Sequence, residues 1–215
     1  MEHSFDAEHA KFLGLDIDPE ILPICQPETA EEAIEIIELS CKYGAGIVVL
    51  DSVGGLVTVA ELEGSNAAAP VARLMSNKLR GIIQHAKASG TCVVFINQIR
   101  KKVGVLFGSP DTTCGGEALK FFASMRIEVR KVGWLKTTNK VVGFKGKIKV
   151  VKNKIAPPYR EAYFNITFDK DSPDLGGLEN MILSGKAEKL GGGYYKIGDK
   201  KFKASTFVGV GGNDE

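Results

Sequence analysis

FINQIRKKVGVLFGSPDTTCGGEALKF, residues 95–121, is the stretch that decides the fold. The apolar run that leads into it, Cys92–Ile96, ends abruptly in two amides, the second of which is Gln98. A basic, glycine-rich loop follows, with Phe107 at its centre, and it closes on a Gly-Gly pair before a helical run. A buried strand that carries an amide to its carboxyl end and continues into a cationic loop is suited to coupling one ligand to another. The stretch therefore predicts an α/β protein with a ligand-responsive loop.

Upstream of this stretch the chain alternates helical and strand-like patterns. Thr29 to Glu32 has the spacing of a capping box and predicts a helix that stops at Gly44. Pro70 suits the first turn of a longer helix that ends at Gly90. The continuous apolar run at Gly46–Leu50 predicts a parallel strand buried on both faces, and a second buried strand is expected over Thr91–Asn97. A short helix is expected over Ala7–Leu13. The inward faces expected of the two longer helices are Ala33, Ile36, Ile37, Ser40 and Cys41, and Leu74, Met75, Leu79, Ile82, Ile83 and Ala86.

Downstream the pattern changes from helical spacing to strict alternation. After a helix near Glu117–Ser124, three alternating segments predict an antiparallel extension of the sheet. The tail beyond Asp171 is rich in glycine and lysine and contains one expected hairpin, Tyr194–Phe202. The alternating segments are Arg126–Val132, Lys147–Val151 and Glu161–Phe168.

Length and composition limit the class of protein. A chain of 215 residues is long enough for one sizeable α/β domain with a small appendage. No apolar run approaches the roughly 18 residues of a membrane span, and the first residues lack the pattern of a secretory signal. Four cysteines occur without a Cys-x-x-Cys pair, and two of them lie in apolar patterns that favour buried, reduced thiols. These features predict a cytoplasmic protein, and the three histidines show no metal-ligand spacing.

The charge is distributed unevenly along the chain. Between Arg100 and Lys154 there are fourteen Lys or Arg residues against three acidic ones, an excess of eleven. Because the whole chain carries a net charge of only +2, the remainder is acidic by about nine charges. Such a division favours a polyanionic partner for the basic segment, although a solvated lysine-rich face has the same composition.

Several segments resemble, in order, the RecA family of recombinases. They are DSVGGL from Asp51, AELEG from Ala60, RLMS from Arg73, the stretch 95–121 and VVKNKIAP from Val150. The resemblance implies an α/β fold: a RecA-like P-loop NTPase core with a parallel sheet, an antiparallel extension, helices on both faces and an incomplete N-terminal side. It also implies a core over residues 1–168 and a small, partly disordered C-terminal region over 169–215.

The same resemblance assigns nucleotide chemistry to individual residues. Asp51, at the end of an apolar strand, and Ser52 are expected to bind ATP, with Asp51 holding Mg²⁺ through water. Glu2 resembles the carboxylate that deprotonates the attacking water, and Gln98 the amide that senses the γ-phosphate and signals to the loop. Lys152 and Lys154 resemble a pair that reaches a neighbouring protomer's ATP across a filament interface.

DNA contacts are likewise implied by the resemblance. Single-stranded DNA would lie along the loop, where Phe107 would either wedge between bases or anchor the loop on apolar surface. A second, weaker site for duplex or displaced strand would use the cations of the later strands. The expected residues are Arg73, Arg100, Lys102, Phe107, Thr112, Thr113, Gly115 and Gly116 for the loop, and Arg130, Lys131, Lys147 and Lys149 for the second site.

One family motif is missing from the sequence. No Gly-x-x-x-x-Gly-Lys-Ser/Thr phosphate loop occurs, so the chain alone is not expected to hydrolyse ATP. Three interpretations follow: a C-terminal part of a recombinase whose P-loop comes from another fragment; a non-catalytic, DNA-binding or regulatory paralogue that joins recombinase filaments; and an inactive remnant. The nucleotide-site residues Glu2, Gln98, Lys152 and Lys154 favour the first, since a simple DNA binder does not need them.

Overall fold

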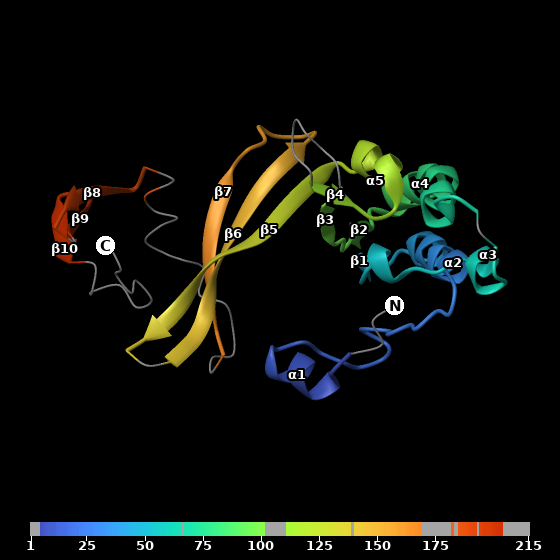
Figure 1. The fold of residues 1–215 in the computed structure, drawn as a ribbon, viewed down its shortest axis with the longest axis horizontal. Coiled ribbons are helices and arrows are strands. Elements are labelled where there is room, and N and C mark those ends of the chain that lie inside the picture. Colours follow the sequence, from blue (N-terminus) through green and yellow to red (C-terminus); the bar gives the residue numbers. More distant parts are fainter. Residues whose placement is uncertain are drawn as a thin grey trace. The chain divides into compact units, whose positions relative to one another are not determined.

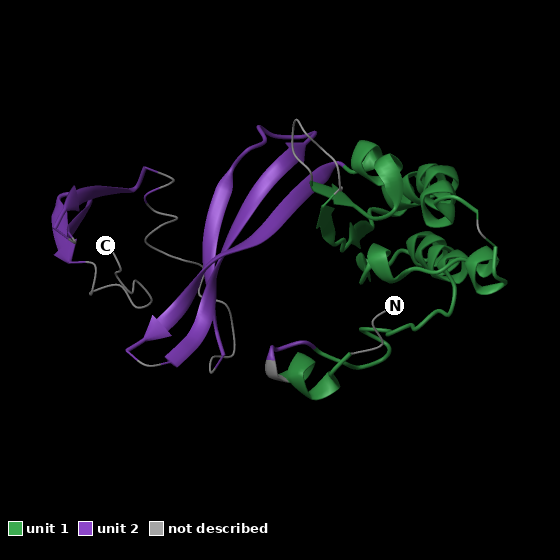
Figure 2. Ribbon diagram, in the orientation of Figure 1, with its two compact units in different colours: residues 1–11, 16–123 green, residues 12–15, 124–215 purple. Residues whose placement is uncertain are grey.

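The computed structural model describes residues 5–65, 67–101, 111–138, 140–168, 182, 185–192 and 194–203. It divides into two compact units, which are coloured separately in Figure 2. Unit 1 comprises residues 1–11 and 16–123, and unit 2 comprises residues 12–15 and 124–215. Each unit has its own internal contacts.

Two short parallel strands form the centre of unit 1 (Figure 1). β1 (Ile47–Leu50) and β2 (Cys92–Phe95) pair in register, with Leu50 opposite Phe95 at their carboxyl ends. A parallel pair needs a long crossover connection, and the 20-residue helix α4 (Pro70–Ser89) provides it. The parallel α/β arrangement expected from the sequence is confirmed.

The helices of unit 1 begin and end where local signals place them. In α2 (Ala30–Lys42) the Thr29 hydroxyl accepts the backbone N–H of Glu32 at 3.2 Å, which satisfies an otherwise unpaired donor of the first turn. α4 starts on Pro70 and ends at Gly90, whose φ of +77° is readily adopted only by glycine. The remaining helical segments are α1 (Ala7–Phe12), the 3₁₀ turn η1 (Val53–Gly55), α3 (Val59–Leu62) and α5 (Gly116–Phe122).

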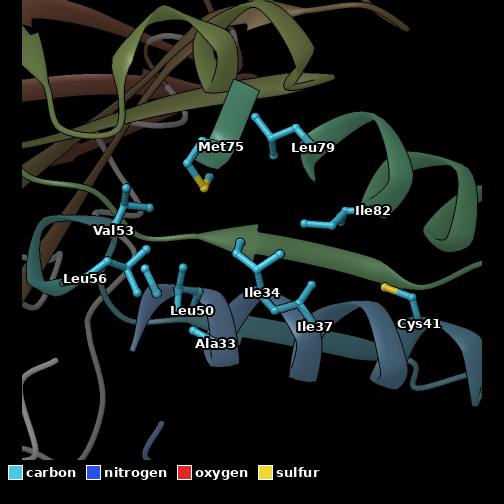
Figure 3. Close-up of a cluster of buried hydrophobic side chains, with 11 residues drawn as sticks. Ala33, Ile34, Ile37, Cys41, Leu50, Val53, Leu56, Met75, Leu79 and Ile82 are labelled. Atoms are coloured by element: carbon cyan, nitrogen blue, oxygen red, sulfur yellow. The ribbon is translucent and has the colours of Figure 1, made fainter. Parts of the chain in front are cut away.

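A single apolar cluster holds these elements together, and Figure 3 shows its side chains. α2 and α4 contact one another, and both present buried side chains to the end of β1. α5 packs against the same cluster through Ala118, Leu119 and Phe122. The cluster consists of Ala30, Ala33, Ile34, Ile37, Cys41, Leu50, Val53, Leu56, Met75, Leu79 and Ile82.

Only one face of the parallel pair is covered in the described part of unit 1. Val48, Leu50, Val93 and Phe95 face the cluster, whereas Ile47 and Val49 on the other face are 61% and 54% exposed. The expectation that both strand faces are buried, and with it the burial of Cys92, is therefore corrected. The reason is that strand residues alternate between faces and the described helices pack on one side.

Two helix faces also differ from the expected ones. Ile34 occupies the core position in α2, whereas Ile36 is only half-buried. On α4 the buried residues are Met75, Leu79 and Ile82, and Ile83 is 39% exposed. Both helices have apolar residues at adjacent positions. The spacing of apolar residues therefore does not decide which of two neighbouring residues faces the core.

Unit 2 is built from antiparallel strands. β5 (Met125–Thr137), β6 (Lys140–Asn153) and β7 (Glu161–Thr167) form a sheet in that order. β5 and β6, with 13 and 14 residues, are longer than the sequence pattern indicated, because each pairs with the other from end to end with three irregularities. The three strands form a sheet of their own. A second sheet, β8 (Ala187–Gly191), β9 (Tyr194–Ile197) and β10 (Lys200–Lys203), contains the expected hairpin.

Among the described residues, no helix is both long enough and apolar enough to cross a membrane.

Core packing in α4 can be tested with two neighbouring residues. We expect Leu79→Ala to lower the free energy of unfolding by about 2–5 kcal/mol, because it leaves a cavity in the cluster. Ile83→Ala removes a similar side chain that is already 39% exposed, and it should cost clearly less. Denaturant unfolding followed by the helical circular dichroism signal reports on unit 1, which contains α2 and α4. Equal losses would contradict the observed helix rotation.

Candidate nucleotide and nucleic-acid site

The carboxyl ends of β1 and β2 are joined by backbone hydrogen bonds beyond the strands themselves. The N–H of Ile96 donates to the carbonyl of Leu50 at 3.0 Å, and the N–H of Val53 donates to the carbonyl of Ile96 at 2.9 Å. The residues that follow each strand are therefore held side by side. This edge is where open parallel sheets bind their ligands.

Asp51 and Ser52 follow β1 at this edge. The Asp51 residue is exposed, whereas Ser52 is buried and its hydroxyl has no hydrogen-bond partner among the residues that the structure describes. A buried hydroxyl without a partner costs free energy and indicates a missing ligand or water. The described residues contain no cluster of three or more His, Cys, Asp or Glu that could bind a metal directly. A single exposed carboxylate beside an unsatisfied hydroxyl fits a hydrated Mg²⁺ held through water.

Gln98 follows β2 and reaches the turn after β1. A Cβ built on Gly54 would lie 3.7 Å from the Gln98 amide oxygen and 3.6 Å from the Cys114 sulfur. The amide of Gln98 therefore lies beside η1, three residues from Asp51. The structure thus places the segment that carries Asp51 and Ser52 beside the segment that carries Gln98, and the family resemblance assigns all three to the nucleotide site.

Asn97 has a role that the sequence interpretation did not assign. Its Nδ2 donates to the carbonyl of Cys114 at 2.8 Å, and its Oδ1 accepts the N–H of Gln98 at 2.9 Å. One amide therefore orients the Gln98 backbone and ties the end of β2 to the end of the loop. The available signal was the second amide at the strand end.

The basic loop leaves and returns through a short hairpin. β3 (Ile99–Lys101) and β4 (Asp111–Thr113) are antiparallel, with Arg100 opposite Thr112 and Ile99 opposite Thr113. Arg100 is exposed. Of the other predicted loop contacts, Lys102 and Phe107 lie outside the described residues, as does Glu2 of the nucleotide site.

Gly115 and Gly116 are required by packing at the close of this loop. Their φ values are +77° and +75°. A Cβ on Gly115 would lie 2.7 Å from Val53, and a Cβ on Gly116 would lie 2.7 Å from Ala72. The second contact sets the loop against the first turns of α4, where the exposed Arg73 follows Ala72.

In unit 2, three cations gather where β5 and β6 meet. Lys152 lies opposite Arg126, and the N–H of Lys154 donates to the carbonyl of Ser124 at 2.9 Å. Partial desolvation, and then the like charges of Lys154 and Arg126, lower the pKa of the Lys152 amine below its ordinary value. Such crowding of like charges is suited to binding an anion.

The cations assigned to a second DNA site lie on two faces of the β5–β6–β7 sheet. Arg130 pairs across the strands with Lys147, and Lys149 projects to the same side, which we call the polar face. The polar face also carries Glu128, Lys145, Glu161 and Tyr163. Lys131 lies on the opposite face, where its amine sits 3.6 Å from the centre of the Trp134 ring. The structure therefore separates Lys131 from the other three.

Known proteins resemble this chain over most of its length. A family model described as the RecA N-terminal domain matches residues 1–172. The chain belongs to the RecA family. It is 44% identical to protein RecA of Acinetobacter baumannii, 43% identical to that of Clostridioides difficile and 45% identical to that of Thermus aquaticus. These matches cover 93%, 93% and 96% of this chain, and 59%, 58% and 63% of the respective relatives. The chain thus spans about three fifths of the length of the curated RecA proteins that it matches.

The close of the loop can be tested through its glycines. We expect Gly116→Ala to destabilise unit 1 by more than the roughly 1–2 kcal/mol of a left-handed alanine, because the new methyl also meets Ala72 at 2.7 Å. Gly46→Ala is the control, since nothing lies within 4 Å of its Cβ position and its φ is not positive. Denaturant unfolding measures both variants. A Gly116→Ala protein as stable as Gly46→Ala would contradict the observed packing.

Proposed function

We propose that this chain is part of a RecA-type protein of homologous recombination and DNA repair, which binds single-stranded DNA and acts in ATP-dependent filaments that exchange strands. The observation that carries the proposal is the convergence of Asp51, Ser52 and Gln98 at one sheet edge, directly joined to the hairpin that bears the basic loop. Membership of the RecA family supports it.

The nucleotide side of this proposal rests on the ends of β1 and β2. When bound, ATP with Mg²⁺ would supply the phosphoryl group whose presence or absence sets the state of the loop. Asp51 would hold the hydrated ion, Ser52 would give its unsatisfied hydroxyl to the same ligand shell, and Glu2 would serve as general base. The Asn97 side chain bonds both to the backbone of Gln98 and to the carbonyl of Cys114. A hydrogen bond gained or lost at the Gln98 amide would therefore change the position of Cys114 at the end of the loop.

The chain has no phosphate loop of its own, so a P-loop-bearing fragment would complete the nucleotide site. Lys152 and Lys154 would contact the ATP of a neighbouring protomer in the filament. The lowered pKa of Lys152 supports this role, because an anion placed among Arg126, Lys152 and Lys154 relieves their mutual repulsion.

The DNA side would use two surfaces. Arg100 with Thr112 and Thr113 on the hairpin, together with Lys102, Phe107 and Arg73, would contact single-stranded DNA. Arg130, Lys147 and Lys149 on the polar face would hold a second strand or duplex more weakly. For Gly115 and Gly116 the proposed contact is through the backbone, since packing already accounts for the absence of side chains.

A second candidate is a non-catalytic DNA-binding member of recombinase filaments, for which the exposed Arg100 and the cations of the polar face would be sufficient. Mixing the chain with a RecA fragment that carries the phosphate loop distinguishes the two. DNA-dependent ATP hydrolysis by the mixture supports the first candidate, whereas DNA binding without any hydrolysis supports the second.

Binding to an oligonucleotide should weaken steeply with salt if phosphates are the main contacts. Each phosphate contact to single-stranded DNA contributes about −0.7 to the slope of log affinity against log salt. We expect Arg100→Met to make the slope shallower by roughly this amount. Lys42→Met is the control, because Lys42 is an exposed cation at the end of α2, away from the hairpin. Fluorescence anisotropy over a salt series measures both, and equal slopes in the two variants would contradict a phosphate contact at Arg100.

The sensing role of Gln98 has a separate test. In the chain completed with a phosphate-loop fragment, we expect Gln98→Ala to abolish the increase in DNA affinity that ATP produces, because the amide no longer reports the γ-phosphate to the loop. Gln84→Ala, an exposed amide on α4, is the control and should leave that increase intact. Anisotropy with and without a non-hydrolysable ATP analogue gives the answer. Persistent stimulation in Gln98→Ala would refute the sensing role.

A further inference from the structure

The polar face of the β5–β6–β7 sheet contains a carboxylate between two of its cations. The Glu161 Oε2 lies 2.7 Å from Lys147 Nζ, and its Oε1 lies 3.6 Å from Lys149 Nζ. Each lysine therefore meets a different oxygen of the same carboxylate. Glu161 lies directly opposite Lys149 on the neighbouring strand and diagonally from Lys147, which is the spacing at which cross-strand side chains interact.

This arrangement has the geometry of a phosphate contact. A backbone phosphate presents two non-bridging oxygens that share one negative charge, and a carboxylate presents the same pair of acceptors. Two lysines separated by two residues on one strand face suit either anion. A phosphate and the Glu161 carboxylate thus require the same two ammonium groups.

We propose that Glu161 is an affinity-determining residue of the polar face, which occupies the place of a DNA phosphate between Lys147 and Lys149 and must be displaced when a strand binds. This inference rests on the proposed DNA-binding function and adds the residue that sets the strength of the second site. The ligand class is a nucleic-acid strand bound through its phosphodiesters.

The other charges of the polar face do not remove this competition. Glu128 pairs with Arg130 on the same strand, and Lys145 and Lys147 lie 5.1 and 5.8 Å from the centre of the Tyr163 ring. Lys147 is thus held by Glu161 and lies near an aromatic face. The ion pair raises the pKa of Lys147 and lowers that of Glu161, so both groups remain charged at neutral pH.

Competition predicts a specific change in the salt dependence of DNA binding. We expect Glu161→Gln to tighten binding of the chain to a labelled double-stranded oligonucleotide by about five- to twentyfold near 0.1 M salt, since one or two lysines become available to phosphates. For the same reason the slope of log affinity against log salt should become steeper by about 0.9–1.8, at about 0.9 for each phosphate contacted in a duplex. Glu188→Gln is the matched control: Glu188 is an exposed acid on β8, and its substitution changes the net charge equally.

A double-mutant cycle provides the second measurement. If Glu161 blocks the lysines, Lys149→Met should reduce DNA affinity more in the Glu161→Gln background than in the unaltered chain. Glu161→Ala gives the same comparison with a side chain that cannot accept a hydrogen bond. Circular dichroism confirms that each variant keeps its strands.

The possible outcomes distinguish a failure of the role of Glu161 from a failure of the proposed DNA-binding function. Tighter binding with a steeper slope in Glu161→Gln alone supports competition. Equal effects of Glu161→Gln and Glu188→Gln would show a general charge effect, and weaker binding in Glu161→Gln would show that the carboxylate positions the lysines; either result overturns the inference and leaves DNA binding in place. Absence of salt-sensitive DNA binding in every variant would overturn both the proposed function and this inference.

Discussion

The in-register pairing of two four-residue parallel strands is the constraint on which the candidate site depends. Because β1 and β2 run in the same direction and end together at Leu50 and Phe95, whatever follows one strand lies beside whatever follows the other. Two further backbone hydrogen bonds extend this pairing past the strands. A slip of one residue would turn the cluster-facing side chains outward and move Asp51 away from Gln98 at the same time. Packing and site geometry are therefore fixed by the same register.

Local signals in the sequence predicted the elements well, because those signals act within a few residues. The Thr29 cap, Pro70 at a helix start and Gly90 at a helix end each satisfy or terminate a single turn, and each lies where the sequence placed it. Burial was harder to predict. Ile83 and Cys92 are residue types that are usually found in cores. Their exposure depends on which side of the helix or strand is covered by other elements, and that is a property of tertiary packing.

In the candidate site, too, local features were predictable and tertiary contacts were not. The positions of Asp51 and Gln98 at neighbouring strand ends were predictable because each follows closely on an apolar run, and parallel strands bring such ends together. Their nucleotide roles come from the family resemblance and stay predictions. The Asn97 contact with Cys114 was not, since it joins residues 17 positions apart through the path of a loop. Adjacent cations were misleading for a simpler reason: Arg130 and Lys131 are neighbours in sequence, and a strand sends neighbours to opposite faces.

The count of charges along the sequence describes residues 100–154 as one basic segment. In unit 2, the cations of this segment have different electrostatic environments. Partial desolvation, and then the like charges of Lys154 and Arg126, lower the pKa of Lys152, so an approaching phosphate would stabilise its protonated form. Lys147 and Lys149 already have a carboxylate partner, so a phosphate gains only the difference between two anions. Equal numbers of lysines would thus give unequal anion affinity. The weak DNA binding that we propose for the polar face would follow from the position of one acidic side chain, Glu161, and would require no shortage of positive charge.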